Sequence, residues 1–131
     1  MPIVRVDVPE WVSHEQKLEV RKEMHGCIER TWFKEHIWVA VRDYTSEPDE
    51  RMVIMTVEVR DGRGHDKERA EALFLEAQEV FQRIVGTQPS EFIVLCRKFG
   101  QEDCISAGDE LPPLETATPP VESLRRREEA A

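Results

Sequence analysis

The second residue of the chain is a proline, and its position gives it a chemistry that other prolines lack. Removal of Met1 from the small residue Pro2 would leave the ring nitrogen as a free secondary amine. An ordinary α-amino group has a pKa of about 8, and burial together with nearby cations lowers the pKa of such an amine. It can then take a proton from carbon as a general base and return it as an acid. Pro2 is therefore a candidate catalytic residue; the alternative is a proline at a strand start, where a missing N–H costs nothing.

Two arginines lie on either side of a glycine in the middle of the chain. In Arg60-Asp61-Gly62-Arg63, Gly62 lets the backbone turn tightly enough for both guanidinium groups to face one space. Two such groups can bind a carboxylate through paired, charge-assisted hydrogen bonds. Arg60 and Arg63 are therefore candidate carboxylate-binding residues, with solvated or ion-paired surface arginines as the alternative.

A histidine on the first predicted helix completes the candidate set. His25 lies one turn after Arg21 and three residues before Ile28, which places it at the border of the apolar stripe of that helix. A histidine there can donate a hydrogen bond to a substrate oxygen or carboxylate. We take His25 as a second candidate catalytic residue; the alternative is a partly buried structural histidine.

The elements that would position these residues form a repeated pattern. Residues 3–8 alternate apolar and polar side chains, as in a strand with one buried face. Ser13 and Gln16 predict a capping box at the start of a helix, and residues 37–41 predict a second strand. Segments that repeat the order strand, helix, strand are 52–59, 66–85 and 92–95. Apolar residues at near-helical spacing on the first helix are Leu18, Met24, Ile28 and Trp32.

The repeat predicts the fold class. A shift of 51 residues lays Ile3 on Ile54 and brings strand and helix starts into register, which indicates pseudo-repeats at 2–46 and 52–103. Two β-α-β units predict an α+β fold with a four-stranded mixed sheet and two helices on one face. We expect one domain over residues 1–110, with trimeric packing as one way to cover the other face. The proline-rich residues 111–131 predict a mobile tail.

Composition narrows the classes of function. The chain has 131 residues, of which 18 are basic and 27 acidic, for a net charge of −9. That excess of acid argues against a general nucleic-acid binder, whereas a few local arginines can still bind a small anion. Three widely spaced cysteines predict neither a disulfide framework nor a zinc site. The sequence shows no leader and no membrane-spanning run, so we expect a cytoplasmic protein with reduced thiols and no metal, cofactor or membrane partner.

The sequence resembles the tautomerase superfamily in three separate places. The opening Pro2 and the two β-α-β units resemble the superfamily as a whole. The segment Met24-His25-Gly26 is similar to the histidine-bearing helix of two longer branches, the malonate semialdehyde decarboxylases and the cis-3-chloroacrylic acid dehalogenases. Arg60-Asp61-Gly62-Arg63 is similar to the Arg-x-Gly-Arg of the dehalogenase branch. The resemblance covers residues 2 to about 110.

This resemblance implies an enzyme without a cofactor that handles a small anionic carboxylate, usually as a homotrimer. It implies Pro2 as acid and base, Arg60 and Arg63 as carboxylate binders, and His25 as a supporting polar contact. The sequence departs from the dehalogenases where Ser106 and Leu95 stand in place of a glutamate and a tyrosine. Hydrolytic dehalogenation is therefore not the leading hypothesis.

Three hypotheses follow from these residues. The leading one is a cofactor-free tautomerase, an isomerase acting on a 2-oxo or unsaturated carboxylic acid through Pro2. The second is a lyase of the same superfamily, a β-keto acid decarboxylase or a hydratase or dehalogenase, in which Pro2 stays protonated as an acid. The third is a non-catalytic oligomeric binding module that retains Met1 and so keeps Pro2 in an amide.

Overall fold

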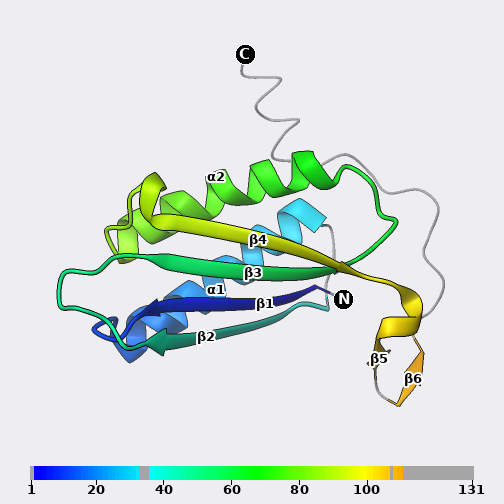
Figure 1. Ribbon diagram of the computed structural model, residues 1–131, viewed down its shortest axis with the longest axis horizontal. Helices are drawn as coiled ribbons and strands as arrows, with labels where there is room; N and C mark the ends of the chain where they lie inside the picture. The colour runs from blue at the N-terminus through cyan, green and yellow to red at the C-terminus, as the bar shows by residue number, and fades with distance from the viewer. Residues whose placement is uncertain (1, 33–35, 107, 111–131) are drawn as a thin grey trace.

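The computed structural model describes residues 2–32, 36–106 and 108–110, which form a four-stranded sheet packed against two helices (Figure 1). The elements in chain order are β1 (Ile3–Pro9), α1 (His14–Trp32), β2 (Trp38–Tyr44), β3 (Val53–Arg60), α2 (Asp66–Ile84), β4 (Phe92–Phe99), β5 (Ile105–Ser106) and β6 (Asp109–Glu110). The proposed tail, residues 111–131, lies outside the described residues.

The sheet has the order β2-β1-β3-β4. The pairs β1–β2 and β3–β4 are parallel, and each is connected through one helix, whereas the central pair β1–β3 is antiparallel. This arrangement confirms the predicted α+β class and the mixed sheet with two helices. It also brings the start of β1, the start of β2 and the end of β3 to one end of the sheet (Figure 1).

The core lies between one face of the sheet and the helices. Strand residues two apart share a face, so Val4 and Val6 of β1 and Met55 and Val57 of β3 are all 0% exposed. On α1 the buried stripe is Val20, Met24, Cys27, Ile28, Thr31 and Trp32. Leu18 was expected in that stripe, but its side chain is 51% exposed because the sheet curves away from the first turns of the helix toward the β2 edge.

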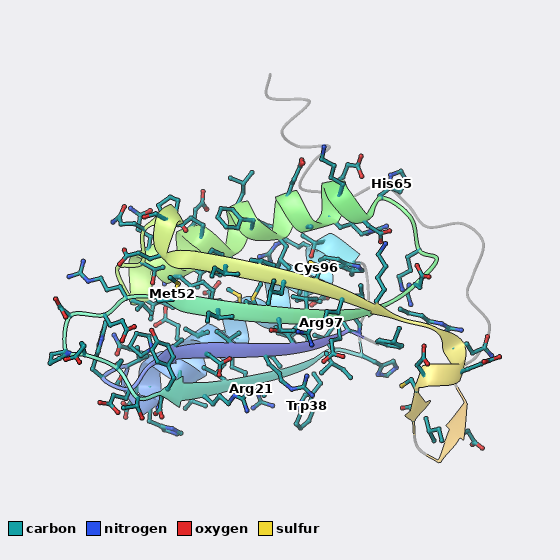
Figure 2. All side chains as sticks on the ribbon, viewed as in Figure 1. Arg21, Trp38, Met52, His65, Cys96 and Arg97 are labelled. Carbon is teal, nitrogen blue, oxygen red and sulfur yellow. The ribbon has the colours of Figure 1, made fainter. Side chains whose placement is uncertain are left out.

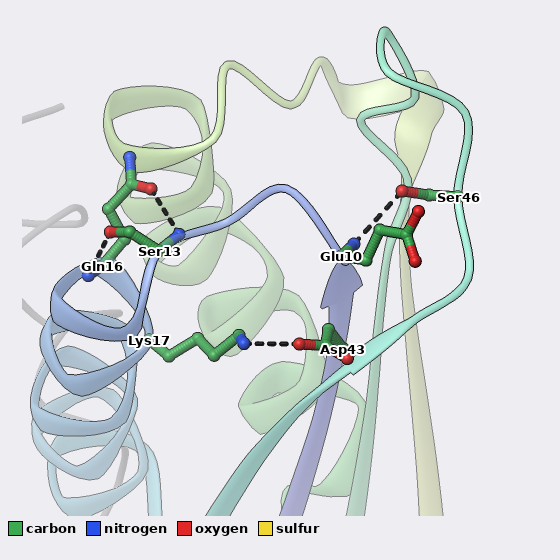
Figure 3. Close-up of polar contacts among 6 residues, drawn as sticks. All are labelled: Glu10, Ser13, Gln16, Lys17, Asp43 and Ser46. Carbon is green, nitrogen blue, oxygen red and sulfur yellow. Dashed lines mark hydrogen bonds and ion pairs between the residues drawn. The ribbon is translucent and has the colours of Figure 1, made fainter.

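The start of α1 is capped as the sequence predicts (Figure 3). The Gln16 N–H donates to Ser13 Oγ at 3.1 Å, and the Ser13 N–H donates to Gln16 Oε1 at 2.9 Å. These bonds give partners to N–H groups that a helix start leaves unpaired, and a cap of this kind contributes about 1 kcal/mol. Lys17 pairs with Asp43 at 2.5 Å, which ties the first turn of α1 to the edge strand β2.

The opposite face of the sheet is covered by neither described helix, and it is turned toward the viewer in Figure 1. We call it the open face. It carries exposed apolar side chains, with Trp38 60%, Ile93 41% and Leu95 44% exposed, and a cross-strand ion pair between Arg5 and Glu58. Neither α1 nor α2 combines the length and the apolar character needed to cross a bilayer, over the residues described.

Candidate active site

Pro2 lies directly before β1 and is buried. Its carbonyl accepts a hydrogen bond from the backbone N–H of Trp38 at 3.1 Å, which fixes it against the start of β2. On its other side, Ile3 is paired with Glu58 of β3. Continued by one residue, this register places Pro2 opposite Val59, so its nitrogen lies at the end of the sheet where β3 delivers Arg60.

Arg60 is the last residue of β3, and its burial is unusual for a cation. It is only 6% exposed, yet within the described part of the chain its side chain makes no hydrogen bond or ion pair. Buried guanidinium groups are ordinarily paired, because desolvation of an unpaired charge is costly. An unpaired, nearly buried cation beside the start of β1 is a binding position for an anion.

Arg63 lies in the turn that follows β3. Gly62 and Gly64 on either side of it have φ angles of 96° and 80°, a left-handed conformation that glycine adopts without strain. The turn therefore forms where the sequence predicts it. Arg63 itself is half-buried and already has an interaction within the chain, so Arg60 is the better placed of the two arginines to receive a ligand.

His25 faces a neighbouring cleft on the helix side of β2. Its side chain is 45% exposed, and its Nδ1 lies 3.7 Å from Glu29 Oε2 one turn later. The cleft, of about 300 Å³, is lined by Leu18, Arg21, Lys22, His25, Ile37 and Val39. Pro2, Arg60 and Arg63 are not among these residues. The structure thus brings Pro2 and Arg60 to one end of the sheet and places His25 beside them, across β2.

Arg21 closes one side of this cleft. Its Nε donates to the Val39 carbonyl at 3.2 Å, and its guanidinium carbon lies 6.0 Å from the centre of the Trp38 ring, a cation–π distance. Figure 2 shows both side chains along the β2 edge. Arg21 is thereby committed to holding the edge strand, which leaves His25 and Lys22 as the polar groups of the cleft.

Sequence reasoning missed Arg69 on α2. It is 0% exposed and donates to two backbone carbonyls. Its signal is its position, because Arg69, Leu73 and Ala77 follow one another at intervals of four residues along the buried stripe. A basic residue in line with an apolar stripe indicates a buried charge with a specific partner.

The other titratable groups offer no competing site. All three cysteines are free, and burial, with help from the Glu76 carboxylate, raises the pKa of Cys27 to about 11, so its thiol is protonated and unreactive at neutral pH. Over the described residues, no three His, Cys, Asp or Glu side chains gather as a metal site would require.

Comparison with known proteins gives a uniform answer at the level of structure. No protein-family model matches the chain, and no curated protein is similar to it in sequence. Among solved structures, Pt0534 inactivated by 2-oxo-3-pentynoate has a TM-score of 0.71 and 17% identity, covering 82% of this chain and 93% of its own. The FG41 malonate semialdehyde decarboxylase inhibited by 3-bromopropiolate has a TM-score of 0.64 and 16% identity, covering 79% and 87%.

A third structure extends over almost the whole chain. N1, a member of the cis-3-chloroacrylic acid dehalogenase family, has a TM-score of 0.70 and 13% identity, covering 98% of this chain and 92% of its own. Fused 4-OT structures are also similar, and some of them are described as trimers. The family models and curated sequences give no match, whereas the three-dimensional similarity is consistent, so what is established is the fold: the chain has the fold of the tautomerase superfamily.

Proposed function

We propose that the chain is a cofactor-free tautomerase that uses the free amine of Pro2 on a small 2-oxo or unsaturated carboxylic acid. The Pro2 nitrogen removes a proton from the carbon next to the substrate carbonyl, which gives an enolate. Arg60 binds the substrate carboxylate, with Arg63 as the second cation of the turn, and their charge stabilises the enolate as it develops. The protonated Pro2 then returns its proton to the enolate at a different atom, which completes the isomerisation.

One observation supports this proposal above the others. Pro2 is buried at the end of the sheet at which Arg60, nearly buried, offers a guanidinium without a partner among the described residues. Burial and a nearby cation both destabilise an ammonium group, so this environment favours the neutral amine that a general base requires. His25 remains a supporting polar contact in the proposal, reached from the neighbouring cleft.

The test is to place Pro2 in an amide without changing any other residue. We expect wild-type protein to lack Met1 by intact-mass spectrometry and to tautomerise phenylpyruvate or 2-hydroxymuconate in an absorbance assay. Insertion of one glycine between Met1 and Pro2 leaves that nitrogen acylated after processing, and we expect activity to fall to background. Equal activity of the two proteins would overturn the proposal. A wild-type chain that retains Met1 and is inactive would instead support the binding module.

The lyase is the second candidate, because the fold is shared with a structure described as a malonate semialdehyde decarboxylase. The same groups would serve it, with Pro2 acting as an acid on a β-keto or acetylenic acid. The two reactions need opposite protonation states of one nitrogen. A Pro2 pKa of about 6 favours the tautomerase and one of about 9 favours the lyase, so titration of the labelled amine by NMR separates them.

We propose further that the chain assembles as a homotrimer through the open face. Trp38, Ile93 and Leu95 are exposed there, and burial of such a surface between copies removes apolar area from water. Fused 4-OT structures with this fold are described as trimers. We expect sedimentation equilibrium to give three times the chain mass of 15.3 kDa, and replacement of Leu95 by lysine to shift it toward the monomer. A monomeric wild type at micromolar concentration would contradict this.

A further inference from the structure

The turn that carries Arg63 adopts a conformation that its own sequence only partly explains. Between β3 and α2, Gly62, Gly64 and His65 all have positive φ angles, of 96°, 80° and 57°. Glycine accepts such angles readily, but a residue with a side chain does so only when its surroundings impose them. The surroundings of His65 must therefore hold the turn in place.

Three contacts hold it. At the start of the turn the Asp61 N–H donates to the Phe99 carbonyl of β4 at 2.8 Å. At its end Lys98 of β4 pairs with Asp66, the first residue of α2, at 2.8 Å. Between them, Arg69 Nε donates to the Gly64 carbonyl at 3.0 Å. Of these three contacts, only the bond from Arg69 reaches a residue adjacent to Arg63.

The second bond from Arg69 goes to a different element. Its Nη1 donates to the Thr31 carbonyl at 2.5 Å, in the last turn of α1, where helix carbonyls have no partner within the helix and carry partial negative charge. The end of α1 lies at the same end of the sheet as the start of β1 (Figure 1). Arg69 therefore bridges the turn that carries Arg63 to the part of the fold that surrounds Pro2.

Packing alone does not require an arginine at this position. A methionine or leucine would occupy the same buried stripe without the cost of desolvating a charge. Burial lowers the pKa of Arg69 against a smaller opposing effect of Asp66, which indicates that the cation is held at some cost. The planar fork of a guanidinium, with donors pointing in two directions, is what the two carbonyls need.

We infer that Arg69 is a positioning residue for the proposed anion site: it fixes the β3–α2 turn, and so Arg63, relative to Pro2 and Arg60. This inference rests on the proposed function. Lysine at position 69 would keep the charge but reach only one of the two carbonyls at a time, so the turn would be released while the core stays filled.

The experiment compares Arg69→Lys with wild type and with Arg83→Lys, a matched change on the same helix at an exposed arginine that pairs with Glu19. Hydrogen exchange by mass spectrometry needs no activity. We expect amides 61–66 to exchange about 10-fold faster in Arg69→Lys and strand β3 to be unchanged. With phenylpyruvate we expect KM to rise about 10-fold and kcat to stay within about 2-fold. Arg83→Lys should match wild type in both measurements.

The two readouts separate the inference from the proposed function. Unchanged exchange in the turn, or faster exchange with an unchanged KM, overturns the positioning role of Arg69. If the wild-type chain converts no 2-oxo acid, the proposed function fails, and exchange of the turn alone then decides whether Arg69 anchors it. Arg69→Met serves as a second variant: faster exchange confined to the turn supports the anchor, and unchanged exchange there overturns it.

Discussion

Replacement of Pro2 by alanine should lower kcat/KM for 2-oxo acid tautomerisation by about 10²- to 10⁴-fold, the range that a positioned acid–base group contributes. Alanine at the second position also permits removal of Met1, so the variant keeps a free amine. What it loses is the ring, which holds the nitrogen in one orientation and makes it a secondary amine. The measurement is the initial rate with phenylpyruvate, followed by absorbance, for proteins whose masses confirm that Met1 is absent.

Pro9 provides the matched control for this change. It is also buried and ends the same strand that Pro2 precedes, but it lies at the opposite end of the sheet. Pro9→Ala should therefore leave kcat/KM within about 3-fold of wild type, whatever it costs in stability. A Pro2→Ala protein as active as wild type would remove Pro2 from the mechanism, because no other feature of the site supplies a base at that position.

Replacement of Arg60 by glutamine should lower kcat/KM by about 10²-fold, mainly through a higher KM, because the carboxylate is bound in the ground state as well as in the transition state. Arg60→Lys should fall between the two, since lysine keeps the charge but cannot bind a carboxylate with two parallel hydrogen bonds. Both follow from steady-state kinetics over a range of phenylpyruvate concentrations.

Stability gives the Arg60 prediction a second edge. Removal of a nearly buried charge that has no described partner should leave the melting temperature unchanged or raise it, because the desolvation cost is relieved. Arg42→Gln is the control, since Arg42 is 68% exposed and pairs with Asp7 on the open face; its kinetics should match wild type. An Arg60→Gln protein with an unchanged KM, or one that melts much earlier, would indicate a structural role.

Much of the fold could be predicted from local patterns. The alternation along β1 and β3 placed their valines in the core, and the Ser13–Gln16 box marked the start of α1 within one residue. Such features depend on neighbours close in sequence. Leu18 has the spacing of a buried residue but is exposed, because burial there depends on how far the sheet extends under the helix, and no local pattern records that distance.

The site was predictable in its parts but not in its assembly. The types and turn chemistry of Arg60, Gly62 and Arg63 can be read from the chain. The convergence of Arg60 with Pro2 depends on the antiparallel β1–β3 register, which links residues more than fifty positions apart. The roles of Arg69 and His25 were harder still to predict, since a bridge between two carbonyls and a cleft across β2 exist only after the helices have packed.

Cys27 bears on how a pH–rate profile of this protein should be read. Its thiol is 1% exposed with a pKa of about 11 in the folded chain, against an ordinary value of 9.0. The folded state therefore holds this proton more tightly than the unfolded chain, so this contribution to folding is complete below about pH 9 and is lost progressively as the pH rises to about 11. An alkaline loss of rate in that interval would report the integrity of the helix–sheet core, and the basicity of the N-terminal amine is best taken from the acidic limb.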